Sequence, residues 1–281
     1  MIFLVSHIIF ASLFALQVKH YQSSGRDMLA VGAINYIVAA VVAGVWVGYK
    51  GEFGISSATW IIGILCGITY FVAFFFILNA VRNSGISITW SIVRLSVIVP
   101  VLFSIFYWKE QPNAFQIGGI MSVCVSLPLL SIRSGNGSDN RINRSASFIV
   151  IALFLVAGVN GLASKAFNEL APPEQRQMYL LFLFGTAAIV STSVAIIRRA
   201  SFKLRDVPFG IILGVCNILA GNSLLLALAR LPGMLVFPVA GSMSIILTTL
   251  AGVTFWRERL QKLTILGIAA AIIAVVLINI K

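Results

Sequence analysis

A motif that occurs twice constrains the fold of this chain more than any other feature of its sequence. Residues 107–110 read Tyr-Trp-Lys-Glu and residues 255–258 read Phe-Trp-Arg-Glu, so the two copies are 148 positions apart. The same offset relates four further pairs: Arg82 and Arg230, Gly85 and Gly233, Ser96 and Ser244, and Gly119 and Gly267. A duplication of this length predicts two copies of one structural unit within a single chain.

The surroundings of the repeat are too apolar for a water-soluble domain. Of 281 residues, 59% are hydrophobic and only 28 are charged, namely 20 Lys and Arg with 8 Asp and Glu. Soluble domains carry about a quarter charged residues, and a helix needs about 20 apolar residues to cross a bilayer. The apolar runs are continuous rather than alternating, which favours helices over transmembrane strands. Ten candidate spans result: 1–18, 28–49, 59–80, 86–108, 115–132, 148–167, 178–197, 207–229, 234–256 and 263–280.

These spans divide into two groups of five. An odd number of spans per copy means that the second copy enters the membrane from the opposite side, so the predicted fold is an all-α integral membrane protein of ten transmembrane helices in two inverted five-helix repeats. We place the first repeat at residues 1–132, a polar linker at 133–147 and the second repeat at 148–281. Gly63-x-x-x-Gly67 and Gly210-x-x-x-Gly214 occupy matching positions, and we interpret them as sites of close helix packing.

The repeated motif also carries a family resemblance. Trp108-Lys109-Glu110 through Gly119, Trp256-Arg257-Glu258 through Gly267, and the lysines Lys19 and Lys165 resemble the EamA type of the drug/metabolite transporter superfamily. The resemblance implies a non-enzymatic, multi-pass transporter of the cell (inner) membrane. It implies as partners a lipid bilayer and a small organic solute such as an amino acid, drug, sugar or nucleotide derivative, often moved outward. It implies no cofactor.

One full charge lies deep inside a predicted span. Arg94 is the ninth residue of the fourth span, and Ser87, Ser91 and Arg94 share one helix face that Trp90 flanks. Arginine at such depth costs at least about 2.5–3.5 kcal/mol, so an intramembrane charge points to function. One interpretation is a guanidinium that binds an anionic or zwitterionic substrate by a bidentate contact. The alternative is a structural arginine that bonds backbone carbonyls.

Four further polar residues complete the candidate site. Tyr70 and Asn217 are related by an offset of 147, and Asn160 lies within the sixth span. Together with Trp90, Ser91 and Arg94 they are our candidate substrate-binding residues; interhelical hydrogen bonds, worth about 0.6 kcal/mol each, are the alternative role. His7 is the candidate proton carrier, because histidine changes charge near neutral pH. A neutral histidine satisfied by its neighbours is the alternative.

Other classes of function find little support in the sequence. The net charge of +12 comes from basic residues at span ends, which act as topology signals, so no nucleic-acid partner is expected. Cys66, Cys124 and Cys216 lack metal-ligand spacing, and no nucleophile motif of an intramembrane enzyme and no charged ring of a channel is visible. The basic-residue count favours termini outside the cell, whereas the resemblance favours the cytoplasm. Orientation and oligomeric state stay open, a monomer included.

Overall fold

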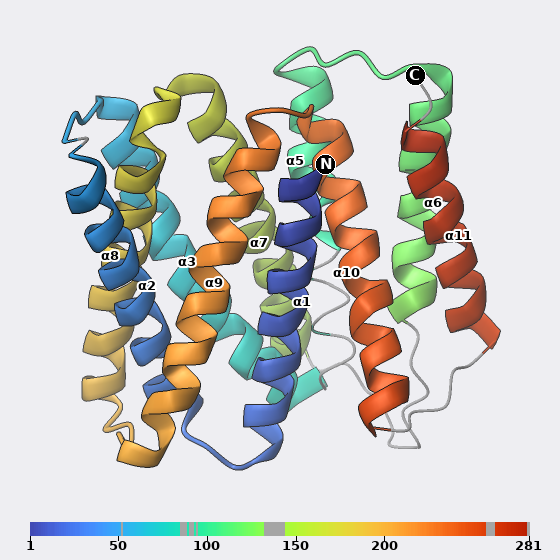
Figure 1. Cartoon of the computed structure of the whole chain (residues 1–281). Helices are drawn as coiled ribbons and strands as arrows, with labels where there is room; N and C mark the ends of the chain where they lie inside the picture. Colours follow the sequence, from blue (N-terminus) through green and yellow to red (C-terminus); the bar gives the residue numbers. More distant parts are fainter. Residues whose placement is uncertain are drawn as a thin grey trace. The chain divides into compact units, whose positions relative to one another are not determined.

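The computed structural model describes residues 1–51, 53–84, 89, 93, 95–131, 144–256 and 262–279, and within them it is all-helical with no strand (Figure 1). The α-helices are α1 (Ile2–Ser23), α2 (Met28–Lys50), α3 (Ser57–Ser84), α5 (Ile98–Phe106), α6 (Ala114–Ser131), α7 (Arg144–Leu170), α8 (Arg176–Ile197), α9 (Val207–Leu228), α10 (Gly233–Trp256) and α11 (Lys262–Asn279). Two short 3-10 helices, η1 (Pro173–Gln175) and η2 (Leu204–Asp206), precede α8 and α9.

Most of the predicted spans coincide with one of these helices. In the part of the chain that the structure describes, seven helices are long and apolar enough to cross a membrane, and α6 and α11 contain shorter apolar segments. Within the predicted fourth span, 86–108, the described residues include α5, which follows a turn at Ser96 and Val97. Helix α7 begins at Arg144, and the predicted linker, 133–147, otherwise lies outside the described residues up to that point. Ten complete spans therefore stay a prediction.

The helices form two compact units that cut across the two halves of the sequence. Unit 1 comprises Met1–Phe74 and Ala163–Arg230, and unit 2 comprises Phe75–Leu162 and Leu231–Lys281. Unit 1 thus contains α2 with its repeat partner α8 and most of α3 with its partner α9. Unit 2 contains α5 and α6 with their partners α10 and α11. The predicted division at residues 133–147 concerns the sequence repeat and remains a prediction; each compact unit draws on both copies.

Within unit 1 the same helix contact is made twice. On α9, a Cβ added at Gly214 would lie 2.6 Å from the carbonyl oxygen of Asn35 on α2. On α3, a Cβ added at Gly67 would lie 2.7 Å from the Cβ of Thr186 on α8. Because α3 and α9 are repeat partners, as are α2 and α8, the two seams are equivalent. The interpretation of these glycines as packing sites is confirmed.

The loops of unit 1 repeat a contact as well. Asp27 caps α2 by accepting a hydrogen bond from the Leu29 amide at 3.1 Å, and its second oxygen accepts one from the Ser201 amide at 2.9 Å. Gln175, 148 positions later, accepts a hydrogen bond from the Ser56 amide at 2.8 Å. Figure 1 places the starts of α2 and α9 at the lower end of unit 1 and the starts of α3 and α8 at the upper end. Equivalent contacts at opposite ends are what an inverted repeat produces.

A buried ion pair holds one of these loop contacts. Arg26, between α1 and α2, pairs with Asp206 at the start of α9, and the carboxylate of Asp206 is almost fully buried. The guanidinium of Arg26 also lies over the ring of Phe209, with its carbon 3.8 Å from the ring centroid. The carboxylate and the aromatic ring offset part of the cost of withdrawing the guanidinium from water. The loop between α1 and α2 is therefore held against the start of α9 by an ion pair as well as by packing.

Unit 2 is built around its own pair of repeat partners. Helices α6 and α11 pack along each other, as do α5 and α10, and each pair runs antiparallel in Figure 1. The Ser122 hydroxyl on α6 donates to the carbonyl of Ala270 on α11 at 2.9 Å, and these two residues are 148 positions apart. A residue that contacts its own repeat equivalent lies close to a local two-fold axis. On α7, Gly158 and Gly161 have no side chain, which lets Val99 and Pro100 of α5 pack closely against them.

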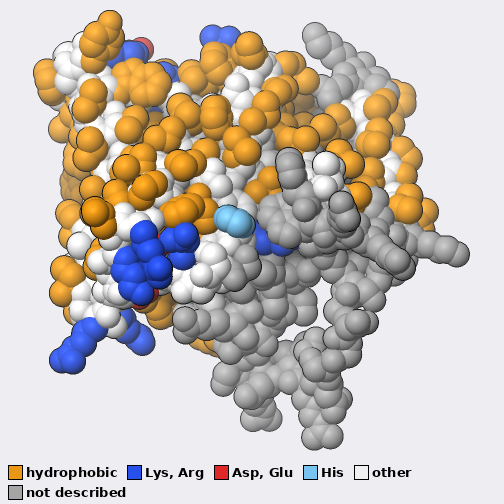
Figure 2. Space-filling model, turned by 60° about the horizontal axis from the view of Figure 1, so that its bottom comes forward, with side chains coloured by type: hydrophobic (Ala, Val, Ile, Leu, Met, Phe, Trp, Pro, Cys, Tyr) orange, Lys and Arg blue, Asp and Glu red, His pale blue; other side chains and the backbone are white. Residues whose placement is uncertain are grey.

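The surface of the helices is apolar where a bilayer would touch it. On α1, Val5, Ile9 and Leu13 are exposed at four-residue spacing, and on α2 the stripe of Ile37, Val41 and Val45 repeats the pattern. Figure 2 shows hydrophobic side chains over much of the described part of this face, with Lys and Arg at its upper edge and at its lower left. Contiguous apolar stripes of this length suit hydrocarbon rather than water.

Candidate functional site

The predicted site residues of unit 1 lie on neighbouring helices. Asn217 is buried on α9, and its Nδ2 donates to Oδ1 of Asn35 on α2 at 3.2 Å. Tyr70 is half-buried on α3, where its ring meets Phe184 of α8 edge-on with centroids 6.0 Å apart. The Tyr70 carbonyl accepts a hydrogen bond from the Tyr36 hydroxyl at 3.3 Å. Asn217 therefore acts at least as an interhelical hydrogen-bond donor, as our alternative proposed.

The other predicted site residues belong to unit 2 or lie outside the described residues. Asn160 is half-buried on α7 and belongs to unit 2, whereas Tyr70 and Asn217 belong to unit 1. Trp90, Ser91 and Arg94 lie outside the described residues. The predicted substrate pocket accordingly stays a prediction.

His7 has a defined hydrogen bond in unit 1. Its Nδ1 lies 2.9 Å from the carbonyl oxygen of Ala220 on α9. A carbonyl only accepts, so Nδ1 must carry the proton, and a change of charge can occur only at Nε2. This geometry fits the satisfied histidine of our alternative and leaves Nε2 as the atom through which His7 would carry a proton.

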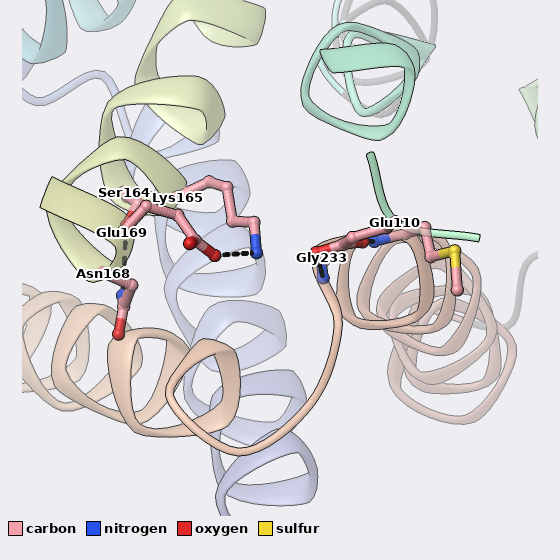
Figure 3. A network of polar contacts seen from close by, with 7 residues as sticks. Glu110, Ser164, Lys165, Asn168, Glu169 and Gly233 are labelled. Carbon is pink, nitrogen blue, oxygen red and sulfur yellow. Dashed lines mark hydrogen bonds and ion pairs between the residues drawn. The ribbon is translucent and has the colours of Figure 1, made fainter. Parts of the chain in front are cut away.

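A buried lysine near the end of α7 pairs with a glutamate one turn away. Lys165 is 3% exposed, and its Nζ lies 2.5 Å from Oε1 of Glu169 in an i,i+4 ion pair (Figure 3). The Asn168 amide donates to the Ser164 carbonyl at 3.1 Å on the same turns. The sequence marked Lys165 only as a repeat position. Its ion pair could have been anticipated from the four-residue spacing, but its burial could not.

The glutamate of the repeated motif caps a helix of the other sequence half. Glu110, in the loop after α5, accepts hydrogen bonds from the Gly233 amide at 2.9 Å and the Met234 amide at 2.8 Å (Figure 3). These are the first two amides of α10, which have no partner within the helix and carry its positive dipole end. Lys109 beside it adopts a left-handed φ of 54°, which turns the chain toward α10. The first copy of the motif therefore serves helix capping.

Removal of this cap should lower stability measurably. Glu110→Ala deletes two charge-assisted hydrogen bonds, so we expect the free energy of unfolding to fall by about 2 kcal/mol, and Glu110→Gln, which keeps one acceptor oxygen, to lose about half of that. Thermal unfolding of the purified protein in detergent measures both. Glu174→Ala, which changes an exposed glutamate of η1, is the matched control. Equal melting of Glu110→Ala and Glu174→Ala would contradict the capping role.

A polar cluster that the sequence analysis missed lies between α8 and α9. Asn222 is buried on α9, and its Oδ1 accepts hydrogen bonds from Nε of Arg176 at 3.0 Å and from Nε2 of Gln177 at 3.2 Å. Asn222 was visible as a polar residue inside the predicted eighth span. Arg176 and Gln177 escaped notice because the predicted seventh span began at residue 178, just after them.

The described residues contain no group of three or more His, Cys, Asp or Glu side chains placed to hold a metal ion.

Comparison with known proteins agrees with the fold and the repeat. The family model described as "EamA-like transporter family" matches residues 1–132 and again residues 144–280. A solved structure titled "Crystal structure of protein" is similar with a TM-score of 0.79 at 16% sequence identity, covering 99% of this chain and 95% of its own, which shows a shared fold. No curated protein matches the chain. Because the family model covers nearly the whole sequence in two copies, the chain belongs to the EamA-like transporter family and is a multi-pass membrane transporter of the drug/metabolite transporter superfamily.

Proposed function

We propose that this protein is a secondary transporter that exports a small organic metabolite or drug-like solute, anionic or zwitterionic, by alternating access across the cell (inner) membrane. Its architecture in this proposal is ten transmembrane helices in two inverted five-helix repeats. The observation that carries the proposal is the pairing of repeat partners: Ser122 on α6 contacts Ala270, its own equivalent, on the antiparallel helix α11. Two copies inverted about a local axis can exchange conformations, which opens a site first to one side and then to the other.

The substrate-binding residues in this proposal are Arg94, Trp90, Ser91, Tyr70, Asn160 and Asn217. Arg94 supplies the charge for the substrate's anionic group, and Trp90 and Ser91 supply a stacking surface and a hydroxyl on the same helix face. Tyr70, half-buried on α3, and Asn217, buried on α9, would supply polar groups from unit 1. His7 is the proposed proton carrier through Nε2.

Transport by the purified protein tests this function. Proteoliposomes loaded with a labelled panel of amino acids, organic acids, sugars and nucleotide derivatives should release one class with saturable kinetics, and external unlabelled solute of that class should accelerate the release by counterflow. Liposomes without protein are the control. Release that never saturates and shows no counterflow would indicate a channel and contradict the carrier mechanism.

A further inference from the structure

The turn between α8 and η2 differs in charge from the equivalent turn in the other copy of the repeat. Residues 198–203 read Arg-Arg-Ala-Ser-Phe-Lys, whereas residues 50–55, 148 positions earlier, read Lys-Gly-Glu-Phe-Gly-Ile. The first turn has three basic residues and no acidic one, and the second has one of each. Because Figure 1 shows the start of α9 at the lower end of unit 1, the basic turn lies at that end. The fold does not require these charges, since the other copy connects α2 to α3 without them.

Arg199 occupies a backbone position that favours glycine. Its φ is 52°, and its equivalent after α2, Gly51, has a φ of 67°. This bend ends α8, where the Ala200 amide donates a hydrogen bond to the Ala195 carbonyl at 2.8 Å. Glycine adopts the left-handed conformation freely, whereas a residue with a Cβ is strained in it. An arginine here is unfavourable for the helix end, so its side chain needs another explanation.

The side chains of the turn combine positive charge with apolar surface. Arg199 and Lys203 are both exposed. Among the described residues no carboxylate forms an ion pair with either of them. Phe202 and Leu204, on the two sides of Lys203, are 48% and 88% exposed. Such a surface suits neither water alone nor hydrocarbon alone, because water opposes the exposure of the apolar groups and hydrocarbon opposes the charges.

The turn begins where the lipid-facing surface of α8 ends. Helix α8 has 22 residues, which at 1.5 Å per residue gives about 33 Å, close to the roughly 30 Å of a hydrocarbon core. Ile196 and Ile197, its last two residues, are exposed. The Ser201 amide donates to Oδ2 of Asp27 at 2.9 Å, which holds the turn against the start of α2. In a bilayer that surrounds α8, the charges of the turn therefore lie at the depth of the lipid headgroups.

Basic side chains at this depth favour negatively charged lipid. Anionic headgroups attract Lys and Arg next to a membrane span, and these long side chains can lie along apolar chains while their charged ends stay at the headgroups. Apolar residues beside them enter the boundary between headgroups and acyl chains.

We infer that the turn at residues 198–203 binds an anionic phospholipid, with Arg199 and Lys203 contacting its phosphate and Phe202 and Leu204 contacting its acyl chains. The inference goes beyond the proposed transport function and does not depend on it, because all of its residues lie at one end of unit 1.

Titration with short-chain lipids tests the inference. The purified full chain in a neutral detergent is titrated with dioctanoyl phosphatidylglycerol, and the bound lipid is counted by native mass spectrometry. Dioctanoyl phosphatidylcholine is the zwitterionic control, and glycerol 1-phosphate presents the phosphate without acyl chains. We expect saturable binding of phosphatidylglycerol, at least tenfold weaker binding of phosphatidylcholine, and no measurable binding of glycerol 1-phosphate.

Variants of the turn locate the binding site. Arg199→Gly installs the residue found at position 51, so it should weaken phosphatidylglycerol binding about fivefold while the melting temperature in lipid-free detergent stays equal or rises. Lys203→Gln, at an exposed position outside the α-helices, should also weaken binding about fivefold, and it keeps the test decisive if Arg199→Gly does not accumulate. Lys50→Gln removes one exposed positive charge from the equivalent turn and should bind as wild type does.

Four results would overturn the inference. They are binding of phosphatidylcholine as tight as that of phosphatidylglycerol, binding of glycerol 1-phosphate as tight as that of the lipid, unchanged binding in both turn variants, and an equal loss in Lys50→Gln. The second result would identify a site for soluble phosphates, and the last would assign the effect to the net charge of the protein. None of these results bears on transport, so the proposed function is tested separately by flux.

Discussion

Gly214→Ala is expected to destabilise the protein strongly. The new methyl carbon would lie 2.6 Å from the carbonyl oxygen of Asn35 and 2.9 Å from the Cβ of Val38, so α9 would have to move away from α2. Backbone atoms cannot rotate out of the way as a side chain can. Overpacking typically costs about 1–3 kcal/mol, and here the Asn217–Asn35 hydrogen bond at the same seam would be lost as well. Thermal unfolding in detergent should show a loss near the upper end of that range.

The repeat supplies both a second test and a control. Gly67→Ala, at the equivalent seam between α3 and α8, should cause a loss of similar size. Gly185→Ala on α8 has open space around its new Cβ, so it should leave stability unchanged or raise it by about 0.5–1 kcal/mol through helix propensity. If all three variants melted alike, helix contact through glycine would not explain the two motifs.

Arg94→Ala should abolish transport of the native substrate while the protein still folds. Arg94 is the residue of our proposed site that brings a full charge into a predicted span, and its loss removes the partner of the substrate's anionic group. We expect at least a hundredfold drop in transport per molecule. Arg94→Lys should recover only part of it, because lysine keeps the charge but lacks the planar fork.

Flux and melting temperature measured on the same samples separate the two roles considered for Arg94. Arg205→Ala, which removes an exposed arginine of η2, is the control for the loss of one positive charge and should transport normally. A lowered melting temperature with normal flux in the surviving Arg94→Ala protein would identify a structural arginine. Normal flux in a fully stable Arg94→Ala protein would remove Arg94 from the proposed site.

The sequence by itself determined the class, the family and most of the helices. Apolar runs of about 20 residues are a local property of the sequence. In lipid the backbone of such a run must satisfy its own hydrogen bonds, which a helix does. The duplicated motif at 107–110 and 255–258 is likewise readable along the chain, and the family model found the same two copies. The glycines at 63, 67, 210 and 214 were predicted as packing sites because small residues four apart allow close approach.

Only the tertiary structure decided what the repeated residues contact. Glu110 reaches the amides of α10, 123 and 124 positions further along the chain, and no local pattern specifies so distant a partner. The same holds for Arg176 and Gln177 at the start of α8. Their shared hydrogen-bond acceptor, Asn222 of α9, lies more than 40 positions further along the chain. Periodicity fixes which residues form a helix, whereas the pairing of helices depends on the summed packing of many side chains from distant parts of the chain. For that reason the sequence predicted two copies of one unit, and the structure showed that three pairs of equivalent helices, α2 with α8, α5 with α10 and α6 with α11, pack together.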